Sequence, residues 1–371
     1  MIETVSLVDQ HCHGALRTEL GLGTFETQLA GTASAAAAGT TFFDTQTGFA
    51  VRRWCPPLLG LEPHCTPARY LGRRRELGTL EVSRRLLGAT GITTYLVDTG
   101  LPGDLASPAE MAAMGQAGAR EIVRLESLAA RVADVSGGVG TFLAGLAESV
   151  HTAAATAVAL SSATGTGHGL APAPEPPGPG AVRGAAARWL AERRTGEPPT
   201  DPVLLRHLLW TAVGSGLPLQ LRSGAGGPLG AADRPDPASL AGFAAATAGL
   251  GTELILLDSY PHHRQAAQLA GFFPHVYADL GPALVHTGAG ARAVLAEMLE
   301  LAPFGKLLFS SGARGLPELQ VVAARNFRAA LGKVLGGWVD DGAWSPADAR
   351  RVAGMIAAGN ARRVYGLAEG G

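Results

Sequence analysis

Eight short apolar runs, separated by segments long enough for helices, constrain the fold of this 371-residue chain more than any other feature. Within each run the apolar and β-branched residues are almost continuous, as in parallel strands that are covered on both faces. The runs occupy residues 4–11, 92–99, 120–127, 156–163, 217–223, 253–259, 275–281 and 306–312.

Helical patterns fill the intervals between these runs. Several begin near a polar cap and end at a glycine, where capping rules place them. The last is expected to start with Ser345 as its cap and Pro346 in the first helical position. The predicted helices span residues 140–155, 201–216, 236–251, 290–304, 316–339 and 345–367.

Eight strands, each followed by a helix, predict a (β/α)8 TIM barrel of the α/β class, forming one domain over residues 1–371. An open doubly wound sheet is the alternative, but no glycine-rich phosphate loop follows the first strand. We expect a long insertion after strand one, at about residues 14–90, and a flexible Pro/Gly-rich loop at residues 164–180.

Composition narrows the class of function. The chain has 30 basic and 31 acidic residues and a net charge of −1, which argues against a nucleic-acid partner or an anionic membrane surface. Its apolar runs are too short to span a bilayer, and three cysteines are too few for a disulfide framework. We therefore expect a cytoplasmic protein whose partner is a small molecule.

His11 and His13 stand at the end of the first predicted strand, in the sequence "LVDQHCHG". Residues i and i+2 of a strand point to the same side, so both imidazoles can reach one ion. Active sites of barrel enzymes gather at the carboxyl ends of the strands. The pair therefore indicates a metal-related site, although two histidines can also cap a strand end through hydrogen bonds alone.

The chain also carries long motifs of a known family. Among them are "VDQHCHG", "RRWCPPLLGLEPH", "SYPHHRQA", "LAPFGKLLFSS" and "GNARRVYGL". With these motifs the chain resembles, from residue 5 to residue 367, the actinobacterial branch of the amidohydrolase-related proteins. That metal-dependent hydrolase superfamily also includes the amidohydrolase half of fungal and plant proteins fused to glutamine synthetase.

The resemblance implies one or two divalent metals, held by the strand-one histidines, a Lys or Glu on strand four, histidines on strands five and six, and an Asp on strand eight. The metal would lower the pKa of a bound water, and the strand-eight Asp would accept its proton. Here the corresponding positions are Ser161, Arg222, Asp258 and Gly312, and Gly167 replaces an expected Arg. Arginine has no lone pair for a metal, and glycine has no proton acceptor.

These replacements leave three interpretations open. In the first, the protein is a catalytically impaired relative in which Arg222 and Asp258 pair across the emptied site. It would bind a small anionic ligand, or join an active paralogue in a mixed oligomer. The residues predicted to bind the ligand are Arg222, Arg264, Arg314 and Glu126.

In the second interpretation the protein is a mononuclear metal-dependent hydrolase of an amide, another C–N bond or a carboxylate substrate. His11, His13 and Asp258 would hold one zinc, manganese or iron ion. His263 or Asp98 would then replace the lost base, and the strand-five arginine would anchor an anionic substrate through its two-pronged guanidinium.

The third interpretation is a metal-free lyase, isomerase or condensing step in small-molecule biosynthesis. His11 or His13 would act as acid or base while Arg222 holds a carboxylate. Each of the three is compatible with a homo-oligomer, because relatives in the family often assemble.

Overall fold

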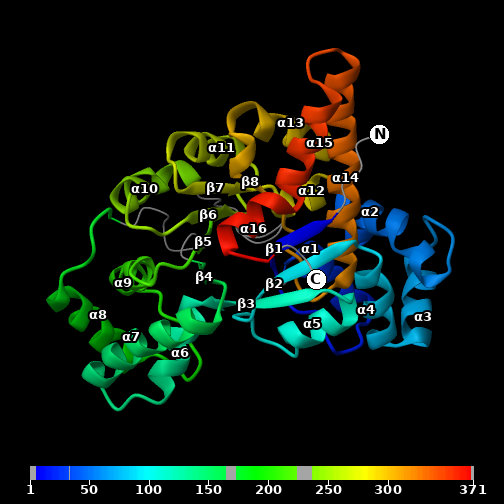
Figure 1. Ribbon diagram of the computed structural model, residues 1–371. Coiled ribbons are helices and arrows are strands. Elements are labelled where there is room, and N and C mark those ends of the chain that lie inside the picture. The colour runs from blue at the N-terminus through cyan, green and yellow to red at the C-terminus, as the bar shows by residue number, and fades with distance from the viewer. Residues whose placement is uncertain (1–5, 33, 164–172, 224–235, 369–371) are drawn as a thin grey trace.

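The computed structural model describes residues 6–32, 34–163, 173–223 and 236–368. Eight parallel strands form one sheet in the order in which they occur along the chain, and helices surround it (Figure 1). The strands are β1 (Leu7–Cys12), β2 (Ile92–Asp98), β3 (Gly118–Arg124), β4 (Ala159–Ser162), β5 (Leu219–Arg222), β6 (Leu254–Leu257), β7 (Val276–Asp279) and β8 (Leu307–Leu308).

Backbone hydrogen bonds join the first strand to the segment around β8. The amide of Gln10 donates to the carbonyl of Phe309 (3.2 Å), and the amide of Gly312 donates to the carbonyl of His11 (3.0 Å). The predicted (β/α)8 barrel is therefore confirmed, and each of the eight predicted runs overlaps one strand.

The helices follow the capping signals in the sequence. Ser345 caps α15 by accepting from the amide of Asp348, and Pro346 occupies the first turn, as predicted. The helices are α1 (Leu22–Ala30), α2 (Gln46–Trp54), α3 (Pro67–Leu77), α4 (Thr79–Gly88), α5 (Pro108–Gly115), α6 (Leu125–Asp134), α7 (Val139–Thr156), α8 (Pro179–Glu192), α9 (Pro202–Val213), α10 (Ala241–Thr247), α11 (His263–Phe272), α12 (Gly281–Thr287), α13 (Ala291–Leu301), α14 (Pro317–Asp340), α15 (Pro346–Gly354) and α16 (Asn360–Tyr365).

Side chains from all sides of the barrel fill its interior, and α16 covers one end. Asn360 Nδ2 donates to the carbonyls of Phe304 and Leu307 (both 2.8 Å), so α16 covers the end at which the strands begin. We call the opposite end, where the strands finish, the mouth of the barrel. The interior cluster includes Val8, Leu96, Ile122, Ile255, Leu308, Ala361 and Tyr365.

The segment between β1 and β2 holds four helices, α1 to α4. Of the Pro/Gly-rich loop predicted at 164–180, residues 164–172 lie outside the described residues, and α8 begins at Pro179. Within the described ranges, no helix combines the length and the apolarity needed to cross a bilayer.

A buried ion pair fastens the insertion to the barrel. Arg74 of α3 lies with its Nε 2.8 Å from Glu318 Oε1 at the start of α14, and Tyr70 donates its hydroxyl to the same oxygen (2.7 Å). The Glu318 side chain is fully buried and that of Arg74 is 9% exposed. Removing one partner of such a pair leaves an uncompensated buried charge, which is more costly than losing an exposed pair.

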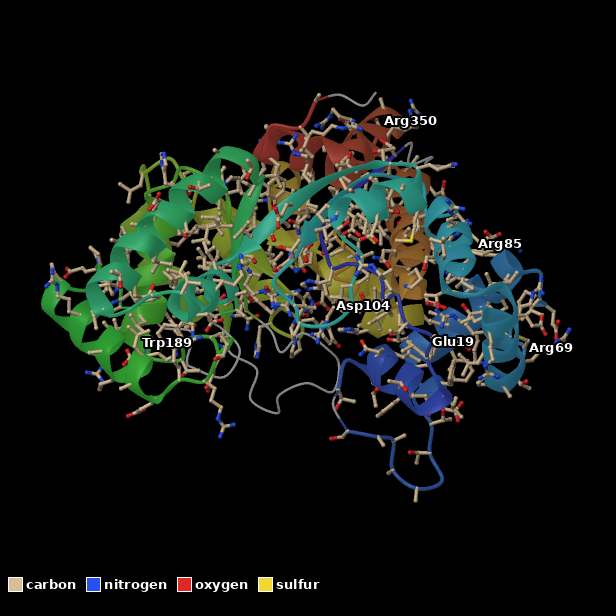
Figure 2. All side chains as sticks on the ribbon, turned by 90° about the horizontal axis from the view of Figure 1, so that it is seen from below. Glu19, Arg69, Arg85, Asp104, Trp189 and Arg350 are labelled. Carbon is tan, nitrogen blue, oxygen red and sulfur yellow. The ribbon has the colours of Figure 1, made fainter. Side chains whose placement is uncertain are left out.

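We predict that Glu318→Ala lowers the free energy of unfolding by about 3–5 kcal/mol, because Arg74 would stay buried without its carboxylate. Denaturant unfolding followed by tryptophan fluorescence measures the change. Glu81→Ala, which breaks the exposed Glu81–Arg85 pair on α4, is the matched control and is expected to cost only about 0.3–0.5 kcal/mol. Arg85 of this pair is labelled in Figure 2. Equal effects of the two substitutions would contradict the anchoring role.

Candidate active site

His11 and His13 lie at the mouth of the barrel, where β1 ends. Both side chains are buried, and their rings meet edge to face with centroids 5.2 Å apart. The prediction that residues i and i+2 face one site therefore holds for this pair.

Hydrogen bonds to Nδ1 determine the tautomer of both rings. His11 Nδ1 lies 2.7 Å from Gln220 Oε1, and His13 Nδ1 lies 2.9 Å from the carbonyl oxygen of Asp98. Both partners are acceptors, so each Nδ1 carries the proton in the neutral ring. The Nε2 atoms are left with lone pairs that face the mouth.

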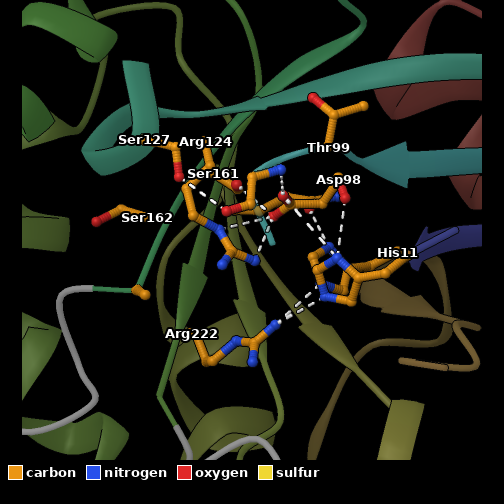
Figure 3. A network of polar contacts seen from close by, with 12 residues as sticks. His11, Asp98, Thr99, Arg124, Ser127, Ser161, Ser162 and Arg222 are labelled. Atoms are coloured by element: carbon orange, nitrogen blue, oxygen red, sulfur yellow. Dashed lines mark hydrogen bonds and ion pairs between the residues drawn. The ribbon is translucent and has the colours of Figure 1, made fainter. Parts of the chain in front are cut away.

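Arg222, the last residue of β5, occupies the position that these lone pairs face. Its Nη2 lies 3.3 Å from His11 Nε2 and 3.4 Å from His13 Nε2, and both rings accept from it (Figure 3). Gln220 and Arg222 are two residues apart on one strand, so they bind opposite edges of the same His11 ring.

The buried surroundings keep both imidazoles neutral. Burial lowers the pKa of His11 to about 4, and the nearby Arg222 charge contributes while Asp98 opposes. Burial likewise lowers the pKa of His13 well below its usual range. Burial also lowers the pKa of Arg222 to about 10, with the Arg124 charge adding to the effect, so Arg222 remains a cation at neutral pH.

Asp98, the last residue of β2, lies beside the histidines but is already saturated with donors. Its Oδ2 accepts from Arg124 Nε (3.2 Å), Arg124 Nη2 (2.9 Å) and Ser161 Oγ (2.7 Å), and its Oδ1 accepts from the amide of Gly100 (2.8 Å). Burial alone would raise the pKa of Asp98. The neighbouring His13 ring, the Arg124 guanidinium and the Ser161 hydrogen bond together hold that pKa well below its usual range.

His11, His13 and Asp98 form a group that could hold a divalent metal by donor type and spacing, since one ligand atom from each lies within 4.8 Å of the others. Asp98 takes the place that the sequence interpretation assigned to Asp258. The charges oppose an ion, because Arg222 Nη2 faces both Nε2 lone pairs and Arg124 neutralises the carboxylate. As they are arranged, these residues do not fit a bound cation.

Gly312, predicted at the position of the strand-eight base, has a backbone conformation that excludes a side chain. Its φ of +56° lies in the left-handed region, and a Cβ there would come within 2.3 Å of Pro282 Cγ. A carboxylate could not be restored at this position without moving the start of α12.

Asp258, directly after β6, is one of three non-glycine residues with positive φ (+54°) in the described part of the chain. It is buried, and its charge raises the pKa of Arg222 against the effect of burial. The recorded hydrogen bonds of Arg222 run to the histidines, so the predicted Arg222–Asp258 pairing appears here as an electrostatic interaction.

The other predicted site residues are spread more widely. His263 Nε2 lies 2.8 Å from Glu297 of α13, and Arg264 pairs with Glu300 of the same helix (2.9 Å). Both are therefore engaged with a neighbouring helix, and their roles in the site stay predictions. Arg314 interacts electrostatically with Arg222, which places it near the mouth.

Glu126 lies in the first turn of α6 and accepts from Ser162 Oγ and from the amide of Ala163 (3.0 Å). It also lines a cavity of about 500 Å³ that reaches Arg124. Sequence reasoning missed Arg124 and Gln220. Their positions at the end of β3 and two residues before Arg222 were the signals that could have identified them.

Comparison with known proteins supports the fold and leaves the activity open. No family model matches the chain. A stretch of 117 residues is 37% identical to Protein fluG of Emericella nidulans, but this match spans 31% of the chain and 14% of that protein.

Solved structures match over nearly the whole chain. A protein described as a metal-dependent hydrolase from Lactobacillus casei superposes with a TM-score of 0.79 and 22% identity, covering 98% of this chain and 96% of that one. Glucuronate isomerase from Caulobacter crescentus gives 0.65 and 14%, covering 98% and 92%. Uronate isomerase from Thermotoga maritima gives 0.64 and 13%, covering 97% and 94%.

These three proteins therefore share the barrel fold with this chain over nearly its whole length. The actinobacterial branch and the relation to glutamine-synthetase fusions stay predictions.

We predict that Gly312→Ala lowers the free energy of unfolding by about 1–3 kcal/mol, because alanine is strained at this φ and its Cβ would overlap Pro282. Chemical denaturation measures the difference. Gly332→Ala is the matched control, since a Cβ there meets nothing within 4 Å and helical alanine is favoured over glycine. A Gly312→Ala variant as stable as wild type would refute the steric argument.

The pH dependence of stability should report the neutral state of His11. Its pKa is about 4 in the folded chain and about 6.5 in the unfolded chain, which therefore takes up the proton first as pH falls. The stabilisation is complete above pH 6.5 and is lost as pH falls towards 4.

We expect wild type to lose about 2 kcal/mol more than His11→Asn between pH 7 and pH 5. Urea unfolding of both proteins at the two pH values gives the comparison, and it cancels the groups that they share. Parallel losses in the two proteins would show that His11 is not held neutral.

Proposed function

We propose that the protein binds a small carboxylate-bearing molecule at the mouth of the barrel through Arg222, as an amidohydrolase-like barrel that does not act as a conventional metal-dependent hydrolase. The observation that carries the proposal is the position of Arg222 Nη2, which donates to both histidine Nε2 atoms. A cationic side chain is held where the two lone pairs converge.

The rest of the Arg222 guanidinium suits an anion. Among the described residues, its recorded hydrogen bonds all involve Nη2, so Nε and Nη1 remain available to a ligand. Arginine nitrogens in this fork arrangement bind carboxylates with two parallel hydrogen bonds. In Figure 3 the guanidinium points one nitrogen at the histidines and turns the others away from them.

The charge of the surroundings supports the same ligand class. Arg124 and Arg314 act on Arg222 as like charges, and Asp98 and Asp258 as opposite ones. Because Arg124 already pairs with Asp98, an incoming carboxylate would relieve repulsion between arginines. Two structural neighbours are named as isomerases of uronates, which are carboxylate sugars, and this agrees with the proposed class.

The histidines favour binding over proton transfer. A base works best when its pKa lies near the operating pH, and that of His11 is about 4. Two neutral rings, oriented by Gln220 and by the Asp98 carbonyl, are well suited to holding Arg222 in one position.

A mononuclear metal hydrolase is the second candidate. The specific observation in its favour is the convergence of His11, His13 and Asp98. A metal could bind there only if the Arg222 side chain moved away from the two Nε2 atoms. The two candidates therefore predict different effects of removing the Arg222 charge on carboxylate and metal affinity.

The deciding experiment compares wild type with Arg222→Met by calorimetry, using glucuronate and malate as carboxylate probes and Zn²⁺ as the metal probe. We expect wild type to bind a carboxylate and Arg222→Met to bind it about 10–100-fold more weakly, the loss of one charge-assisted fork. We also expect Zn²⁺ affinity to rise in Arg222→Met, because the repelling charge is gone.

Arg183→Met, on the exposed face of α8, is the control for the loss of one positive charge. Metal analysis of the purified wild type completes the test. Stoichiometric metal that is lost in His11→Ala, together with no affinity for either carboxylate, would overturn the proposal in favour of the hydrolase.

A further inference from the structure

A second cavity, of about 710 Å³, lies on the outside of the barrel between α2, α13 and the middle of α14. None of its lining residues belongs to the site at the mouth. Its size falls within the range of about 300–1,000 Å³ that is usual for small-molecule sites.

The Lys and Arg side chains that line this cavity make its walls positively charged. Arg53, Arg292 and Lys333 line the cavity, and none of its other lining residues in the described part of the chain is Asp or Glu. All three are exposed, and no ion pair with them is recorded anywhere in the described ranges. In a chain with 30 basic and 31 acidic residues, three unpaired cations around one cavity form a local positive field that attracts anions.

The cations project from a wall that is already ordered. Arg53 lies over the ring of Trp54, with its guanidinium carbon 4.1 Å from the ring centroid. Trp54 Nε1 in turn donates to Asn326 Oδ1 (3.3 Å), which ties α2 to α14. Less conformational freedom is therefore lost when Arg53 binds a ligand.

The first turn of α13 adds to the positive potential at the cavity. The N-cap Gly290 makes no side-chain capping hydrogen bond, and no acidic residue lies in the first turn. Gln46 of α2 accepts from the amide of Ala289 (3.1 Å) and so holds this loop against the cavity. The positive end of the helix dipole adds to the charge of the three side chains.

One wall is apolar. Phe49 is 49% exposed at the cavity, beside the small side chains of Ala50, Ala329 and Ala330. A simple inorganic anion would leave this surface in water, whereas an anion with a flat organic part would cover it.

We propose that this cavity is a second binding site, which takes an aromatic organic phosphate such as a nucleoside diphosphate. The phosphate groups would lie among Arg53, Arg292 and Lys333, and the ring would lie on Phe49. Affinity should fall as salt rises, because exposed cations supply most of the attraction.

Calorimetry on the 371-residue chain tests the site with ADP, pyrophosphate and adenosine as probes. We expect ADP to bind more tightly than pyrophosphate, and adenosine to bind least. The double variant Arg292→Glu/Lys333→Glu should bind ADP at least about tenfold more weakly, since it loses two charge-assisted contacts to the phosphates.

Arg350→Glu is the matched control. Arg350 is exposed on α15, outside the cavity lining, and is labelled in Figure 2. Arg222→Met should bind ADP as wild type does, which separates this site from the one at the mouth.

Three results would overturn the inference. Wild type could fail to bind ADP or pyrophosphate at millimolar concentration. Arg350→Glu could weaken ADP binding as much as the double variant does. Sedimentation could show that the double variant dissociates an oligomer without any change in ADP affinity, which would make the cavity a subunit contact.

Discussion

The structure of the mouth depends on how β5 holds the ring of His11. Gln220 accepts from His11 Nδ1 and Arg222 donates to His11 Nε2. Two residues on the same side of one strand therefore determine the tautomer of the ring and supply the donor to its lone pair. His13 repeats the arrangement with the carbonyl of Asp98 behind it and the same Arg222 Nη2 in front. A site of this kind is pre-ordered around a guanidinium, and any ligand must be accommodated by the remaining Arg222 nitrogens.

The mouth of this barrel is thus organised around a cation that belongs to the chain itself, the Arg222 guanidinium. Arg222 contributes one positive charge, where a divalent ion would contribute two, and it brings hydrogen-bond donors in a fixed plane. Such a centre cannot lower the pKa of a bound water as a metal does. A guanidinium can instead orient an anion. The chemistry of the site must therefore be argued from its residues and not from the barrel fold.

The barrel could be predicted because its signal is local and repeated. Each strand needs only a short apolar run, and each helix needs only its caps, as at Ser345 and Pro346. The histidine pair could be predicted for the same reason, since i and i+2 on a strand share a side. The third member of the cluster could not. Asp98 meets the histidines because β2 pairs with β1 in a register that sets Val97 opposite Cys12, and local sequence patterns do not show that register. Asp258 has a left-handed backbone that no spacing rule shows. Gly312 is similar, because its lack of a side chain is understood only once Pro282 is seen against it.

The end of the barrel that α16 covers is connected by hydrogen bonds to the histidine site at the mouth. Tyr365, in the last helix, donates its hydroxyl to Gln10 Oε1 (2.6 Å) and accepts from Gln220 Nε2 (2.8 Å), while the other end of the same Gln220 amide holds His11. One amide thus connects the helix that covers the start of the strands with the ring that accepts from Arg222. If Gln220 turned over, His11 would meet a donor instead of an acceptor, and its lone pair would turn away from Arg222. The final helix therefore helps to fix the tautomer of His11. A substitution at Tyr365 would change which His11 nitrogen carries the lone pair that faces Arg222, although no residue at the mouth had altered.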